Sequence, residues 1–104
     1  MHDTKEKIKE FCITNQFNKK DENRFVRYIT PNDIIEIVLK EGGVYIKYRV
    51  TFVLDGENYK EYFVNKLIYF NQLKIYDIED ISIIIKNEIT NIIKGAYSDI
   101  LFNK

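Results

Sequence analysis

A run of strict alternation over residues 44–54 constrains the fold of this chain more than any other feature of its sequence. Tyr45, Lys47, Arg49 and Thr51 alternate there with six apolar or aromatic residues, namely Val44, Ile46, Tyr48, Val50, Phe52 and Leu54. Successive side chains of a β-strand point to opposite faces, so the pattern predicts a strand with one buried and one exposed face. Eleven residues make this strand about 36 Å long, and it needs both strand neighbours and a covering layer.

The segment after this strand predicts a hairpin. The sequence Asp-Gly-Glu-Asn at positions 55–58 is typical of a tight connection, and residues 59–70 then form the returning strand. Two-, three- and four-residue loops all fit, so the register of the hairpin stays open. Either Tyr62 or Phe63 therefore joins Tyr45 and Lys47 on the exposed face.

Further strands are expected before the hairpin, for a total of three to five. Residues 25–30 are rich in β-branched and aromatic side chains, whereas the charged residues 18–23 suggest a surface loop. Residues 31–41 fit two structures. Their stiff run of Ile and Val favours a strand ending in a Gly42-Gly43 turn, and Thr30 followed by Pro31 also fits a short helix.

Two helices are predicted at the ends of the chain. Asp3 and Glu6 have the spacing of a capping box, and an apolar stripe through Ile8 and Phe11 predicts a helix over about residues 4–17. A stripe of isoleucines at helical spacing predicts a second helix over about residues 78–94, ending at Gly95. Strands that follow one another directly, with helices at both ends, predict an α+β fold in two layers with a largely antiparallel sheet. A length of 104 residues indicates one domain, residues 1–104.

Side chains that support most catalytic or metal chemistry are scarce. The chain has one His and one Cys, at positions 2 and 12, which cannot supply the usual ligand set of a zinc site. Its four glycines form no phosphate-binding motif. We therefore expect no metal, no cofactor and no catalytic residue, and the chain is not expected to be an enzyme.

Catalysis by carboxylate side chains is the one type of enzyme chemistry that the composition does not exclude. Asp77, Glu79 and Asp80 cluster in the sequence, as metal-dependent nucleases and glycosidases would require. A helix that begins nearby also favours negative charge at that position. A carboxylate-dependent enzyme is therefore kept as the third hypothesis, behind two binding functions.

Charge and composition bear on partners and compartment. Sixteen basic residues balance sixteen acidic ones, which argues against a binder driven by unspecific charge attraction to nucleic acid or membranes. Ile, Lys, Asn, Tyr and Phe make up more than half of the chain, which is typical of a low-GC bacterial or phage genome. No signal peptide or transmembrane segment is visible and Cys12 has no partner, so we expect a cytoplasmic protein, in the host cytoplasm if a phage encodes it.

The exposed face of the hairpin is the candidate site, with Tyr45, Lys47, Arg49, Thr51 and Phe63 as its residues. Tyrosines among cationic side chains suit a protein partner, and we predict a small non-catalytic protein-binding module, for example a phage or mobile-element inhibitor of a host enzyme or defence complex. Aromatic and basic residues on a sheet also suit single-stranded nucleic acid, which is the alternative function. The isoleucine stripe between Ile78 and Ile93 is wide, so a homodimer through this helix is a further expectation.

Overall fold

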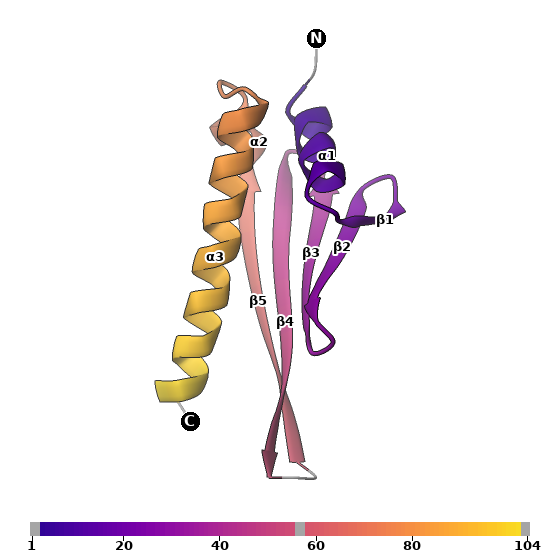
Figure 1. Ribbon diagram of the computed structural model, residues 1–104. Coiled ribbons are helices and arrows are strands. Elements are labelled where there is room, and N and C mark those ends of the chain that lie inside the picture. Colours follow the sequence, from indigo (N-terminus) through magenta and orange to yellow (C-terminus); the bar gives the residue numbers. More distant parts are fainter. Residues whose placement is uncertain (1–2, 56–57, 103–104) are drawn as a thin grey trace.

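The chain forms one antiparallel sheet with helices on one side of it. The structure, a computed structural model, describes residues 3–55 and 58–102, with the side chains of residues 3–51 and 61–98. Its elements are, in chain order, α1 (Thr4–Thr14), β1 (Asn18–Asp21), β2 (Arg24–Thr30), β3 (Asp33–Lys40), β4 (Gly43–Asp55), β5 (Asn58–Tyr69), α2 (Phe70–Leu73) and α3 (Ile78–Phe102). The five strands pair in the order β1-β2-β3-β4-β5, and α1 and α3 lie on the same face of the sheet (Figure 1). The predicted α+β fold is confirmed.

The hydrophobic core lies between the sheet and these two helices. Along β3 every second side chain is buried, and the same holds on β4 from Val44 to Val50. The residues that fill the core from the strands include Phe25, Ile35, Ile37, Leu39, Val44, Ile46, Tyr48 and Val50. We call this helix-covered side the inner face of the sheet and the opposite side the outer face.

Within residues 31–41, Asp33–Lys40 form the strand β3 and not a helix, as the run of Ile and Val favoured. β3 pairs with β2 on one side and β4 on the other, so its β-branched side chains pack in the centre of the sheet. Lys40 pairs with Gly43, which leaves Glu41 and Gly42 as a two-residue turn. Gly42 has a φ of 83°, a conformation that glycine adopts without steric cost.

The register of the long hairpin resolves the choice between Tyr62 and Phe63. Asp55 pairs with Asn58, Arg49 pairs with Phe63, and Val50 pairs with Tyr62. Phe63 therefore lies on the outer face beside Arg49, and Tyr62 lies on the inner face. The side chains of Phe52 and Leu54, which the alternation assigned to the buried face, lie outside the described residues.

The first helix is shorter than predicted, and the segment after it is a strand. α1 ends at Thr14 instead of at about residue 17, since Gln16 has a φ of 66° that no helix continues. Residues 18–21 were expected in a loop, but they pair with β2 as the edge strand β1. All four side chains of β1 are exposed, so the strand has no alternating pattern by which its sequence could reveal it.

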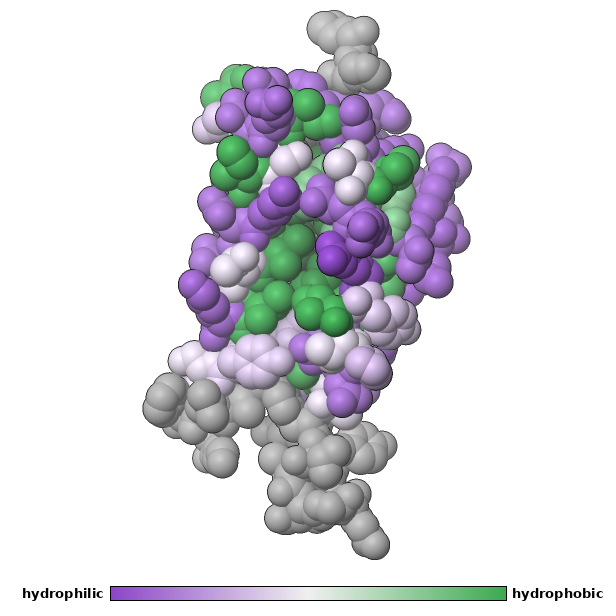
Figure 2. Space-filling view, in the orientation of Figure 1, coloured by the Kyte–Doolittle hydropathy of each residue, from purple (hydrophilic) through white to green (hydrophobic). Residues whose placement is uncertain are grey.

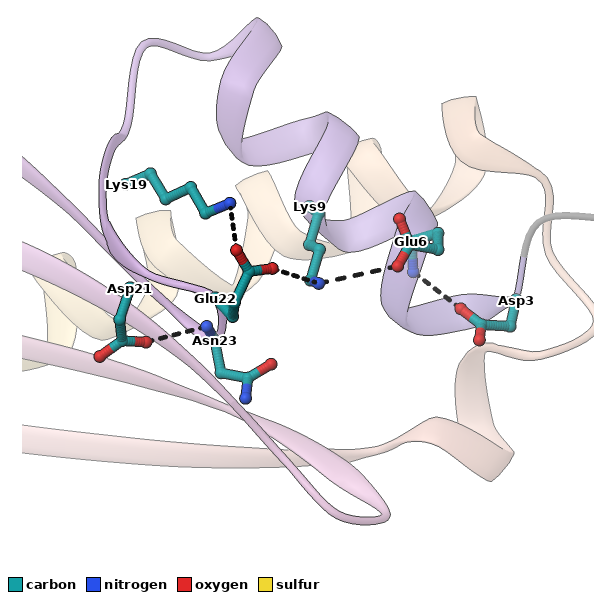
Figure 3. Close-up of polar contacts among 7 residues, drawn as sticks. All are labelled: Asp3, Glu6, Lys9, Lys19, Asp21, Glu22 and Asn23. Carbon is teal, nitrogen blue, oxygen red and sulfur yellow. Dashed lines mark hydrogen bonds and ion pairs between the residues drawn. The ribbon is translucent and has the colours of Figure 1, made fainter.

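A chain of ion pairs links α1 to the turn between β1 and β2 (Figure 3). Lys19 Nζ lies 2.9 Å from one carboxylate oxygen of Glu22, and Lys9 Nζ lies 3.7 Å from the other. Lys9 also faces Glu6 at 3.7 Å. The hydrogen bond and charge of Lys19, together with the charge of Lys9, lower the pKa of the Glu22 carboxyl. Asp3 caps the start of α1 by accepting a hydrogen bond from the backbone N–H of Glu6.

The last helix is longer than predicted. α3 continues through Gly95 to Phe102, whereas the sequence suggested an end near residue 94. Glycine ends a helix when it adopts the left-handed conformation beyond the last turn, and Gly95 has no such φ. Ile92 and Ala96 flank it and are buried against the sheet, so tertiary packing holds the helix across a residue of low helix propensity. Within the described residues, no helix has the length and apolarity needed to cross a membrane.

Candidate functional site

The five residues proposed from the sequence lie together on the outer face. Tyr45, Lys47, Arg49 and Thr51 follow one another along β4, and Phe63 stands beside Arg49 on β5. Phe63 is 63% exposed, although it is a large apolar side chain on the edge strand β5. The structure thus places all five residues on one surface, which no helix of the described chain covers (Figure 1).

Cross-strand pairing arranges the outer face in three rows that run across β2, β3, β4 and β5. The first row is Tyr28, Ile34, Arg49 and Phe63; the second is Val26, Glu36, Lys47 and Asn65; the third is Arg24, Val38, Tyr45 and Leu67. Two rows rich in aromatic and aliphatic side chains therefore border a central row that carries the Glu36 and Lys47 charges. Neighbouring rows are about 7 Å apart, so side chains of adjacent rows are within reach of one another.

Several residues of the outer face were not predicted from the sequence. Tyr28, Ile34, Val38 and Leu67 belong to the same surface, and so does Tyr69, which is 57% exposed at the end of β5. Their strands have apolar residues on both faces, so alternation alone does not mark them as exposed. Only the pairing partners Ile34–Arg49 and Val38–Tyr45 assign them to this side.

The centre of the face carries more positive than negative charge, since the one carboxylate of Glu36 lies among Arg24, Lys47 and Arg49. Glu36 is about one-fifth exposed, and its carboxylate lies 2.7 Å from Arg24 Nε and 3.9 Å from Lys47 Nζ. A carboxylate between two cations neutralises part of the positive charge that Lys47 and Arg49 suggested from the sequence. No ion pair between described residues includes Arg49, which therefore keeps its guanidinium available beside Phe63.

Two shallow hollows indent the outer face and meet at its centre. The larger, of about 670 Å³, extends from the turn at Gly42 along Tyr45, Leu67 and Tyr69. The smaller, of about 380 Å³, lies between Ile34, Arg49 and Phe63. Lys47 and Asn65 line both hollows, so the two form one continuous depression in the surface. Both are open, and they suit the side chains of a partner surface better than an enclosed small molecule.

The size of the outer face is sufficient for a specific protein contact. Eight residues of β3 extend about 26 Å, and five strands span about 19 Å, so the face offers roughly 500 Å². Counted on both partners this is about 1,000 Å², the lower limit for a specific protein interface.

Asp77 and Cys12 occupy structural positions in the fold. The carboxylate of Asp77 accepts a hydrogen bond of 2.9 Å from the backbone N–H of Asp80, which is how a helix start is capped. Cys12 is buried in the core, and burial raises the pKa of its thiol to about 12, so it is protonated at neutral pH. In the part of the chain that the structure describes, no three His, Cys, Asp or Glu side chains converge as a metal ion would need.

One polar cluster lies on the inner face, between the sheet and α3. The Tyr97 hydroxyl donates a hydrogen bond of 3.0 Å to the buried carboxylate of Asp33. Tyr48 is fully buried in the same region, and burial, the Tyr97 hydroxyl and the Asp33 charge all raise the pKa of its phenol. The cluster holds a buried carboxylate by a hydrogen bond from α3, which suits a structural role.

The isoleucine stripe of α3 packs largely inside the monomer. Ile81, Ile85 and Ile92 are buried against the sheet, and Ile84, Ile89 and Ile93 are partly buried at the edges of the same cluster. Ile83, which is 56% exposed, points away from this core. The homodimer through this helix stays a prediction.

No known protein family, curated protein or solved structure shows significant similarity to the chain.

Proposed function

We propose that this chain is a non-catalytic protein-binding module that docks on its partner through the outer face of the sheet. The observation that carries the proposal is the asymmetry of the sheet: two helices cover one face, and the other presents exposed Tyr28, Phe63 and Tyr69 without a cover. Monomeric proteins seldom leave a contiguous patch of large apolar side chains in water unless it binds something.

The composition of the face supports a protein partner. Aromatic residues and arginine are enriched in protein interfaces and carry most of their binding energy, and here Phe63 stands next to the unpaired Arg49. The Glu36 carboxylate between Arg24 and Lys47 gives the face charges of both signs. Charges of both signs discriminate among protein partners.

A module of this kind acts by occupying a surface that its partner needs. We place that partner in the cytoplasm, because the unpaired thiol of Cys12 suits a reducing compartment. The codon-biased composition fits a low-GC bacterium or its phage, and inhibition of a host enzyme or defence complex is the form of this function that we propose.

Affinity capture from a lysate of the natural host tests the proposal. We expect the wild type to retain a partner that both Phe63→Asp and the double variant Lys47→Glu with Arg49→Glu lose. Ile83→Asp is the matched control, since it adds an acid at a similarly exposed apolar site on α3 and should retain the same partner. Circular dichroism establishes that each variant is folded. Capture of the same partner by both outer-face variants would exclude this face.

Nucleic-acid binding by the same face is the alternative, and the exposed Phe63 ring beside Arg49 is the observation that favours it. It predicts affinity for single-stranded oligonucleotides that falls with salt and is lost in Tyr45→Ala with Arg49→Ala. Fluorescence anisotropy at low salt measures this directly. Our protein-binding proposal expects no binding to single- or double-stranded oligonucleotides.

A further inference from the structure

A second open surface lies on the inner face of the sheet, where α1 ends before the strands beneath it do. The 11 residues of α1 extend about 16 Å, whereas the eight residues of β3 extend about 26 Å. The lower part of β2 therefore has no helix over it (Figure 1), whereas the inner-face side chains of β3 are buried.

The uncovered strip is a groove of about 370 Å³ with an apolar floor. Its apolar side chains come from five parts of the chain: Phe11 from α1, Phe17 from the segment after it, Ile29 from β2, Ile35 from β3 and Ile89 from α3. Ile29 is 47% exposed. Figure 2 shows hydrophobic residues in this hollow between α3 and the sheet, enclosed by hydrophilic residues.

Two cations flank the groove from opposite walls. Arg27 belongs to β2 and Lys86 to α3, and both line the groove. Arg27 donates a hydrogen bond of 2.9 Å to the backbone carbonyl of Asn15, and no ion pair between described residues includes either cation. The described side chains that line the groove include no carboxylate. The nearby polar cluster contains Asp33, which already accepts the Tyr97 hydroxyl.

We propose that this groove binds an amphipathic helix of a partner protein, with acidic residues on both sides of its apolar stripe. The strip already holds α1 over its first part, so its width between α3 and the sheet edge accepts a helix. Two turns of such a helix would place apolar side chains at positions i, i+3, i+4 and i+7 over Ile29 and Ile89. Acidic residues on the two flanks would then face Arg27 on one side and Lys86 on the other.

The groove is separate from the outer face, so a negative result for one surface does not contradict the proposal for the other. The groove residues lie on the opposite side of the sheet from Phe63 and Lys47, so variants of one surface leave the other intact. A partner captured through the outer face need not occupy the groove.

Fluorescence anisotropy with two labelled helical peptides tests the proposal. One 12-residue peptide carries Leu at i, i+3, i+4 and i+7 with Glu on both flanks, and the other has Lys in place of every Glu. We expect the acidic peptide to bind the wild type at least tenfold more tightly than the basic peptide. In Arg27→Glu with Lys86→Glu the preference should reverse. Lys74→Glu with Lys94→Glu, two exposed sites outside the groove, is the matched control and should bind as the wild type does.

A variant of the floor tests the apolar contact. Ile29→Asp should weaken the acidic peptide at least tenfold, and its exposed position allows the protein to fold, which circular dichroism checks. Equal binding of the two peptides, or no binding of the acidic one, would overturn the proposal. So would tighter binding of sodium dodecanoate, which would make the groove a site for small amphiphiles. Sedimentation that shows a wild-type dimer dissociated by Ile29→Asp would overturn it in favour of a second copy.

Discussion

The inner and outer faces of this sheet are built from alternate residues of the same strands, yet they have different roles in the molecule. On β3, Ile35 and Ile37 are fully buried under the helices, while their neighbours Ile34 and Val38 remain half-exposed on the other side. All four are β-branched and apolar, so residue type does not separate them. The position of α1 and α3 decides which of them become core and which become surface.

This comparison explains why the outer face is a candidate interface. β4 alternates cleanly between apolar and polar residues, and such a strand alone would give an ordinary solvated face. β2, β3 and β5 bring apolar residues to the same side, where they surround the Glu36 and Lys47 pair. The difference between an ordinary solvated face and this candidate interface therefore arises from the neighbours of β4.

Truncation of one phenylalanine on each face gives the largest expected contrast. Phe25→Ala removes a buried ring from the core and should lower the free energy of unfolding by about 3–5 kcal/mol. Phe63→Ala removes an exposed ring and should change it by no more than about 0.5 kcal/mol. Urea unfolding measures both. Equal losses in the two variants would mean that the outer face is packed and not available to a partner.

Removal of one tyrosine hydroxyl from each face should give a smaller contrast. Tyr97→Phe deletes the hydrogen bond to the buried carboxylate of Asp33 and should lower the free energy of unfolding by about 1–2 kcal/mol. Tyr28→Phe, on the exposed outer face, should leave it within about 0.5 kcal/mol of the wild type. Equal urea midpoints for the two variants would contradict the expected difference in stability between the two faces.

The dependence of stability on alkaline pH should reveal that Cys12 of α1 is buried against the inner face. The thiol pKa rises from 9.0 to about 12 on folding, so above pH 9 the unfolded chain releases a proton that the folded chain retains. The stabilisation is fully present below pH 9 and is lost as the pH rises toward 12. Between pH 9 and 10.5 the wild type should lose about 1.5 kcal/mol more than Cys12→Ala. Parallel pH profiles for the two proteins would contradict the burial.

Substitution of Gly95 should give the smallest effect and the opposite sign. Gly95 lies inside α3 with no neighbouring atom within 4 Å of an added Cβ, so Gly95→Ala should stabilise the protein by about 0.5–1 kcal/mol. Gly42→Ala is the control, because a φ of 83° makes alanine destabilising there. Thermal unfolding distinguishes the signs. A destabilising Gly95→Ala would indicate that the helix ends at this glycine, as its sequence suggested.

Much of the fold followed from local periodicity. Alternation over residues 44–54 predicted the central strand, and the helical spacing of Ile81, Ile85 and Ile92 predicted the last helix, because each pattern belongs to one segment. Where the pattern was weak, prediction failed: β1 is exposed on every residue, and the end of α3 depends on burial of Ala96 beyond a glycine.

The sequence by itself determined the long hairpin and the two terminal helices, and it placed Tyr45, Lys47, Arg49 and Thr51 on one exposed face. Only the tertiary structure decided that Phe63 and not Tyr62 stands beside Arg49, that Ile34 and Val38 join this surface, and that α1 leaves a groove over Ile29. The physical reason is that a side chain's face follows from its own segment, whereas its neighbours follow from loop geometry and from the packing of segments far apart in the chain.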